Sequence, residues 1–269
     1  MSQIGWAGPV SIAQVGATSL PGDHVGVIQC KGDGSPSCGQ MADSWPQASK
    51  VASFLSAAKL DPSDPDGVIL RAFSAGGSMF KRVLLGDDAG RVRVVALSDA
   101  TYTDWASPGN PTPPEGFVRF GLEALKGDRM LVATASSAPN GKMPNGSQTL
   151  EALKNEIERR SGVSFREGGN IPGMPTQPMR LWTHGSVILA DYGNLTTHTQ
   201  HATKLAAPLW ENVIVPWLGG SAPVKPGPQV PPGPMIADEL APWVLALIGS
   251  GCAVAGFYIA NNIRNRIST

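Results

Sequence analysis

Hydrophobic residues along this chain recur in two patterns, as short continuous runs and as longer stretches with helical spacing. The short runs predict buried strands at residues 24–30, 68–73, 91–97 and 129–135, with one long strand or a pair of strands at 180–192. The longer stretches predict helices at residues 47–60, 78–85, 115–125, 150–160 and 202–218. Residues 6–15 are apolar but contain Gly and Pro, and they fit a strand or a loop. The alternation of strands and helices predicts an α/β fold, with a mostly parallel sheet covered by helices on both faces.

The pattern changes after residue 220. Residues 221–234 read SAPVKPGPQVPPGP, and a segment so rich in proline is extended and semi-rigid. Residues 241–260 contain no charged side chain and are long enough to cross a bilayer as a helix. We therefore predict four parts, which are a globular domain at 1–220, a linker at 221–238, a transmembrane helix at 239–263 and a short basic tail at 264–269.

The predicted span makes the lipid bilayer a partner and the protein a single-pass membrane protein with a C-terminal anchor. Its Gly and Ala residues have the small-xxx-small spacing of helices that self-associate. Arg264 and Arg266 follow the span, so the positive-inside rule predicts a cytoplasmic tail and an external domain. Residues 1–20, however, lack the basic start and long apolar core of a secretory signal peptide, which favours a domain in the cytoplasm. Both orientations stay open.

Charge and cysteine content limit the partners further. The chain has 269 residues, with 21 Lys and Arg against 21 Asp and Glu, so its formal net charge is zero. No basic patch of the kind that binds nucleic acid is present in the sequence. Cys30 and Cys38 could close a loop as a disulfide or remain free thiols.

The most informative stretch for chemistry is residues 67–77, GVILRAFSAGG. A buried strand ends at Ser74, small residues follow, and a helix begins directly afterwards. A sharp strand-to-helix turn of this kind needs small residues two positions before and after the serine, and Ala72 and Gly76 occupy those positions. A second small-x-Ser-x-small motif, centred on Ser98, is followed by no glycine pair and no predicted helix. Ser74 therefore resembles the nucleophile of the α/β-hydrolase family of serine esterases and lipases, whose usual motif is G-x-S-x-G.

This resemblance implies where an oxyanion would bind. The family uses the backbone amide of the residue after the nucleophile, which is Ala75 here, and a second amide from a loop after an early strand. The loop at residues 31–39 is rich in glycine, so Gly32 is the candidate for the second amide, and an ordinary surface turn is the alternative.

A serine hydroxyl needs an imidazole to accept its proton, and the imidazole needs a carboxylate to fix its tautomer. Asp99 ends the strand after the Ser74 helix, and Asp104 is a reserve acid. His198 and His201 follow the last predicted strand, and either could be the base. The order Ser, Asp, His along the chain matches that of the resembled family. The remaining histidines, His24 and His184, lie at or next to predicted strands and are interpreted as structural.

The sequence thus predicts a membrane-anchored serine hydrolase that cleaves a small-molecule or lipid ester with Ser74, an acid and a histidine. We predict no metal and no cofactor, because the H-E-x-x-H spacing of a hydrolytic metal site is absent from the sequence. The main alternative is a hydrolase scaffold without catalysis that binds or assembles other components at a membrane. A weaker third possibility is a pore-forming or lysis-associated protein that acts through its C-terminal span.

Overall fold

A computed structural model of the chain describes residues 3–8, 22–29, 51–63, 67–102, 111–139 and 144–220. The chain divides into two units, Met1–Pro228 and Gln229–Thr269, and every described residue belongs to the first.

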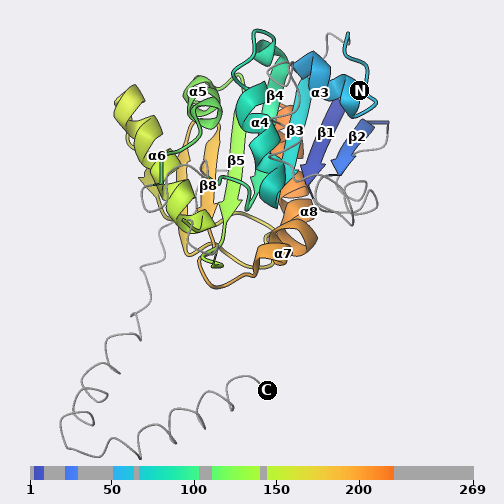
Figure 1. The fold of residues 1–269 in the computed structure, drawn as a ribbon. Coiled ribbons are helices and arrows are strands. Elements are labelled where there is room, and N and C mark those ends of the chain that lie inside the picture. The colour runs from blue at the N-terminus through green and yellow to red at the C-terminus, as the bar shows by residue number, and fades with distance from the viewer. Residues whose placement is uncertain are drawn as a thin grey trace, which may run out of the picture. The chain divides into compact units, whose positions relative to one another are not determined.

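One sheet of eight strands forms the centre of this unit (Figure 1). The strands lie in the order β2-β1-β3-β4-β5-β8-β7-β6. All neighbours from β2 to β8 pair in parallel, whereas β7 runs antiparallel to both β8 and β6. The predicted mostly parallel α/β sheet is therefore confirmed. The strands are β1 (Gln3–Gly8), β2 (His24–Gln29), β3 (Val68–Phe73), β4 (Val92–Ser98), β5 (Met130–Ala135), β6 (Arg166–Glu167), β7 (Arg180–His184) and β8 (Val187–Asp191).

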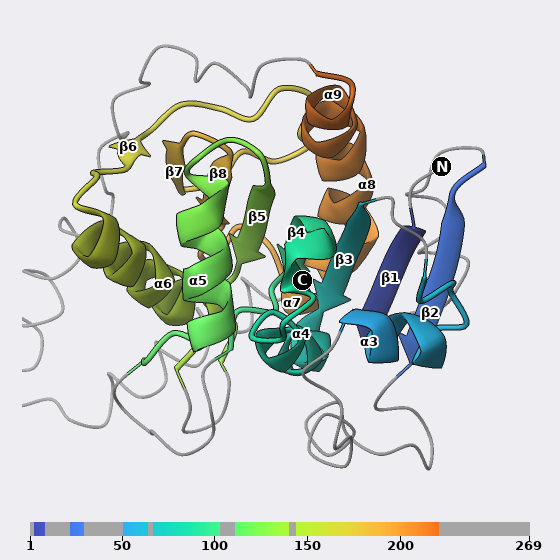
Figure 2. The same ribbon diagram turned by 90° about the horizontal axis from the view of Figure 1, so that it is seen from above.

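Helices cover both faces of the sheet (Figure 2). Four helices with amphipathic sequences, α3 to α6, bury their apolar sides on one face, where the larger hydrophobic cluster lies. A helical segment from His198 to Leu218 covers the other face and packs on the second cluster. The bounds are α3 (Val51–Ala57), η1 (Ser74–Gly76), α4 (Gly77–Val83), η2 (Ala89–Arg91), α5 (Glu115–Ala124), α6 (Gly146–Ser161), α7 (His198–Gln200), η3 (His201–Leu205), α8 (Ala206–Leu209), η4 (Trp210–Ile214) and α9 (Val215–Leu218).

The segment from His198 to Leu218 is a continuous helix with two widened turns. Its stretches η3 and η4 have π-helical hydrogen bonding. Pro208 and Pro216 follow these stretches closely, and neither can donate the backbone hydrogen bond that a regular α-helix would require. The wide turns therefore let a helix with two interior prolines continue along the sheet.

Strand β1 lies inside the sheet, although the sequence prediction left residues 6–15, which include the end of this strand, open between strand and loop. It pairs with β2 on one side and β3 on the other. Gly5 is required there, because a Cβ at that position would lie 2.3 Å from the ring of Phe54 on α3. The glycine that weakens the strand pattern is the residue that lets α3 pack closely on the sheet.

An arginine side chain lies inside the described part of the unit. Arg71, in the middle of β3, is almost completely buried, and its guanidinium lies 5.2 Å from the ring of Trp6 and 5.0 Å from that of Trp210. Burial disfavours the charged form and lowers the pKa of Arg71 to about 9. The guanidinium therefore stays cationic at neutral pH and joins β1 to the helix on the far face.

The strand order marks the expected position of a site. The chain moves from β1 to β2 on one side and then returns to β3 on the other, so the order reverses between β1 and β3. In open α/β sheets, ligands bind at such a reversal, beyond the carboxyl ends of the strands. Ser74 follows the carboxyl end of β3 directly.

The predicted linker, span and basic tail, residues 221–269, lie outside the described residues. Within residues 3–220 as described, no helix is both long and apolar enough to traverse a bilayer. The anchor stays a prediction from the sequence.

Candidate functional site

Ser74 occupies a strained turn between β3 and the helix that starts with η1. Its φ is 55°, in the left-handed region that side chains other than glycine rarely adopt. Ala72 and Gly76 are both buried, as the motif requires. The sequence did not reveal the role of Gly77, at which a Cβ would lie 1.9 Å from the carbonyl oxygen of Ala100. The second glycine of the pair thus lets the segment after β4 approach the start of α4.

His198 reaches Ser74 from the start of α7. Its Nε2 lies 2.8 Å from Ser74 Oγ. The Gln200 side chain accepts a hydrogen bond from the Thr197 amide and thereby fixes the turn that carries the imidazole. The ring of Phe73 stacks on the imidazole, with the ring centres 4.7 Å apart. About a third of the His198 side chain is exposed, so this end of the site is open to solvent.

Asp99 lies on the other side of the imidazole. Its Oδ2 is 2.8 Å from His198 Nδ1, and its side chain is fully buried. Because a carboxylate only accepts hydrogen bonds, the proton of this bond is on Nδ1, and the Nε2 lone pair faces the Ser74 hydroxyl. We refer to these three hydrogen-bonded side chains as the Ser74–His198–Asp99 row.

Asp99 directly follows β4, and its φ of 47° lies in the left-handed region, so the extended backbone of the strand ends at this residue. Its amide donates to the Thr134 carbonyl oxygen over 2.9 Å, so pairing with β5 continues up to this residue. Ser136, just past the end of β5, donates to Asp99 Oδ1 through its amide (3.1 Å) and to Oδ2 through its hydroxyl (2.5 Å). The acid is therefore held by the ends of two neighbouring strands.

Tyr102 is a further neighbour of the imidazole. Its hydroxyl oxygen lies 3.3 Å from His198 Nδ1. Burial and, to a smaller extent, the charge of Asp99 both raise the pKa of the Tyr102 hydroxyl. The phenol thus remains neutral beside the row across the physiological pH range.

The other candidate base, His201, lies away from Ser74. Its Nδ1 is 2.7 Å from Thr134 Oγ1 and its Nε2 is 2.9 Å from Thr196 Oγ1. The ring is fully buried, and burial is the main reason that the pKa of His201 falls to about 4. Both ring nitrogens are thus occupied by threonine hydroxyls, and the imidazole stays neutral above about pH 4.

Of the other predicted site residues, Ala75 lies among the described residues. Ala75 follows Ser74 in the first turn of its helix, where backbone amides have no partner within the helix. Gly32 and Asp104 lie outside the described residues. Asp191, at the end of β8, bonds Ser147 and Arg180 and not His198. In the described part of the chain, His, Cys, Asp and Glu side chains form no group suited to hold a metal.

Three residues around the row were not predicted from the sequence, namely Phe73, Tyr102 and Ser136. Phe73 and Tyr102 read as ordinary strand and loop residues, and nothing in their spacing indicates contact with His198. Ser136 directly follows the end of β5. A polar residue at the carboxyl end of the strand next to β4 was the available signal.

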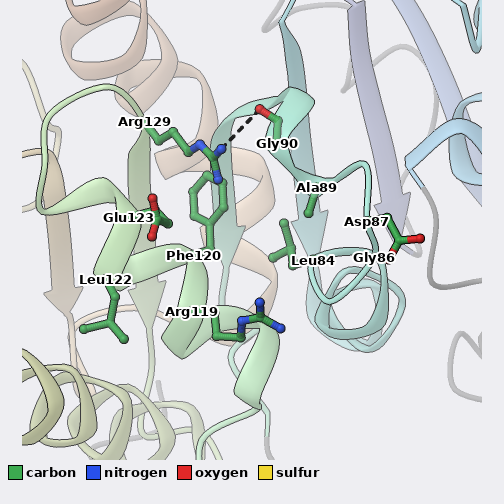
Figure 3. A pocket seen from close by; sticks show the side chains of 10 residues that line it. All are labelled: Leu84, Gly86, Asp87, Ala89, Gly90, Arg119, Phe120, Leu122, Glu123 and Arg129. Atoms are coloured by element: carbon green, nitrogen blue, oxygen red, sulfur yellow. Dashed lines mark hydrogen bonds between the residues drawn. The ribbon is translucent and has the colours of Figure 1, made fainter.

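A separate pocket of about 380 Å³ lies away from the row (Figure 3). It includes Gly90, before β4, and Arg129, before β5, so it borders the amino ends of these strands, opposite Ser74 and Asp99. Arg129 donates to the Gly90 carbonyl oxygen over 3.2 Å, and its guanidinium lies 5.9 Å from the ring of Phe120. The pocket is lined by Leu84, Gly86, Asp87, Ala89, Gly90, Arg119, Phe120, Leu122, Glu123 and Arg129.

Comparison with known proteins adds no relative. The sequence matches no protein-family model, and no curated protein matches it. The α/β architecture is compatible with the α/β-hydrolase resemblance.

Proposed function

We propose that this protein is a serine hydrolase of the α/β-hydrolase type that cleaves an ester, with Ser74 as nucleophile. The observation that carries the proposal is the Ser74–His198–Asp99 row, with both of its hydrogen bonds at 2.8 Å. Serine, imidazole and carboxylate in this order form the arrangement that activates a hydroxyl for attack on a carbonyl. Their position at the carboxyl ends of β3 and β4 and after β8 supports it further.

In the proposed reaction, Ser74 Oγ attacks the carbonyl carbon of the ester while His198 Nε2 accepts the hydroxyl proton. The imidazolium that forms is stabilised by Asp99 through Nδ1. His198 then gives the proton to the departing alcohol, which leaves an acyl group on Ser74. Water, activated by the same imidazole, attacks the acyl group, and its hydrolysis restores the free serine. No cofactor is required for these steps.

The negative charge on the carbonyl oxygen needs hydrogen-bond donors during each attack. The Ala75 amide is suited to this role, because it follows Ser74 in the first turn of a helix. We assign the second donor to Gly32, on the resemblance alone. Asp99 is the proposed acid and His198 the proposed base, whereas His201 is proposed to be structural.

The predicted anchor makes a lipid or another ester at a membrane a plausible substrate class. A non-catalytic scaffold is the alternative, and it would not require an unprotonated imidazole nitrogen facing a serine hydroxyl. The strained φ of Ser74, 55°, also favours catalysis, since strain of this kind clusters at functional sites.

The test is labelling of the full-length chain with a fluorescent fluorophosphonate, which reacts covalently with activated serine hydroxyls. We expect labelling of the native chain, loss of labelling in Ser74→Ala, and a reduction of at least a hundredfold in His198→Ala, since removal of the base leaves an ordinary hydroxyl. His201→Gln is the matched control and should be labelled like the native chain. A folded native chain that takes up no label would contradict the proposal and favour the scaffold.

A further inference from the structure

Ser136 makes two hydrogen bonds to the buried carboxylate of Asp99, although it is not one of the three residues of the row. Its amide bonds Oδ1 over 3.1 Å and its hydroxyl bonds Oδ2 over 2.5 Å, so one residue contacts both oxygens. Oδ2 is also the oxygen that accepts from His198 Nδ1. Both Asp99 and Ser136 are buried, so water does not compete with these bonds.

The hydrogen bonds around Ser136 show that it is the donor in its bond with Asp99. The Ala138 amide donates to Ser136 Oγ over 3.4 Å, which occupies a lone pair of the hydroxyl oxygen. A hydroxyl has a single proton, and the Asp99 carboxylate can only accept. Ser136 therefore gives its proton to Asp99 Oδ2.

The backbone around Ser136 is held from two further directions. Its carbonyl oxygen accepts from the Ser147 amide in the first turn of α6, over 2.9 Å. The next amide, that of Ser137, donates to the Gly193 carbonyl oxygen over 2.8 Å. Ser136 is thus tied to β5, to α6 and to the loop after β8, and it cannot follow Asp99 if the carboxylate rotates.

The start of α6 blocks the remaining side of the carboxylate. A Cβ at Gly146 would lie 2.1 Å from Asp99 Oδ1, so only a glycine fits between the helix and this oxygen. Rotation of the carboxylate would break two hydrogen bonds from Ser136 and drive an oxygen into α6. The plane of the acid is therefore fixed before His198 meets it.

We propose that Ser136 is a positioning residue, which holds the Asp99 carboxylate in the one orientation that directs Oδ2 at His198 Nδ1. Its effect on reaction rate rests on the hydrolase function proposed above, whereas its effect on the Asp99–His198 hydrogen bond does not. Without the hydroxyl, Oδ2 loses one of its two donors, and the carboxylate is held less firmly, by the Ser136 amide and the start of α6 alone. The imidazole then loses its fixed tautomer and orientation for part of the time.

The experiment compares full-length Ser136→Ala, Ser136→Cys and Ser137→Ala with the native chain in detergent solution. The rate constant of fluorophosphonate labelling should fall about ten- to hundredfold in Ser136→Ala, the range for a lost hydrogen bond to a charged group. Ser136→Cys places a larger sulfur atom at the same position and has a weaker donor, so its rate should be intermediate. Ser137→Ala removes the neighbouring, partly exposed hydroxyl and should label at the native rate.

A second readout does not depend on reactivity. The Nδ1 proton of a histidine bonded to a carboxylate gives a far-downfield proton NMR resonance, which His198→Ala would assign by its loss. In Ser136→Ala this resonance should move upfield or vanish through exchange with water, and in Ser137→Ala it should stay in place. A native chain that is not labelled would count against the hydrolase function, and the resonance would still test Ser136.

The proposal is overturned if folded Ser136→Ala keeps the native Nδ1 resonance. It is also overturned if Ser136→Ala and the native chain, both reactive, label within twofold of each other. A merely structural Ser136 would lower the thermal midpoint and leave both readouts unchanged.

Discussion

The two histidines three positions apart show how strongly the surroundings of a residue decide its chemistry. His198 lies partly exposed between Ser74 and Asp99, whereas His201 is fully buried between two threonine hydroxyls. The sequence could not separate them, because both follow β8 at the start of the same helix. The difference arises from tertiary contacts with Thr134 and Thr196, which have no sequence signal of their own.

The burial of His201 has a consequence for stability in acid. The folded-state pKa is lowered to about 4, chiefly by burial, while the unfolded chain has the ordinary histidine value of about 6.5. Below pH 6.5 the unfolded state therefore binds a proton that the folded state does not bind. The contribution of the neutral His201 to the free energy of unfolding is complete above about pH 6.5. It is lost as the pH falls towards 4, by about 3 kcal/mol in all.

Replacing the imidazole by an amide should remove this dependence. We expect the free energy of unfolding of native protein to fall by about 3 kcal/mol more between pH 7 and pH 4 than that of His201→Gln. Chemical denaturation of both chains at the two pH values measures the difference. Parallel losses in the two chains would mean that His201 is protonated in the folded state as readily as in the unfolded state.

Among the elements, those with a strong local pattern were predicted well and those shaped by close packing were not. The strand at residues 68–73 was predicted with the observed bounds, because all its residues are buried and its pattern is continuous. The first strand, Gln3–Gly8, was not predicted as a unit, because the undecided apolar stretch at residues 6–15 overlaps only its end and contains Gly8 and Pro9. The hairpin of β7 and β8 was left open between one strand and two, and Gly185, with φ of 54°, forms the turn that separates them.

Helix α3 shows an element that depends on a distant residue. The amides of Val51 and Ala52, at its start, donate to the two carboxylate oxygens of Asp88, each over 2.8 Å. A side chain 37 positions later in the chain thus caps the helix. A negative charge is also favourable at this end of the helix dipole.

Removal of this cap should loosen α3 at its first turn. We expect Asp88→Ala to lower the free energy of unfolding by about 1–2 kcal/mol, since two amides in partly buried hydrogen bonds lose a charged acceptor. Asp87→Ala, at the exposed neighbouring position, should change it by less than about 0.5 kcal/mol. Urea unfolding of the two variants makes the comparison, and equal losses would show that α3 does not depend on this carboxylate.

At the scale of the whole molecule, the described unit contains both hydrophobic clusters and the complete Ser74–His198–Asp99 row. All three residues of this row precede residue 220. The sequence therefore separates a domain that would perform the chemistry from a tail that would determine its location. The predicted location rests on the composition of the tail, a proline-rich spacer before an uncharged stretch.

Ending the chain after Gly220 should separate these two roles. We expect the shortened chain to be labelled by fluorophosphonate at close to the native rate and to lose its association with membranes. The full-length chain should sediment with lipid vesicles and the shortened chain should not. A shortened chain that still sediments would place membrane affinity in residues 1–220, and a folded one that resists labelling would give the tail a role in the site.

The order in which the row is assembled follows from the distances along the chain. Asp99 precedes His198 by 99 positions, and Ser74 precedes it by 124. At a synthesis rate of about 5–20 residues per second, the ribosome adds His198 roughly 5–20 s after Asp99. During that interval the nascent chain contains Ser74 without the proposed base, so the proposed reaction would have to wait for the last described helix. The proposed nucleophile would therefore become reactive only when the domain is almost complete.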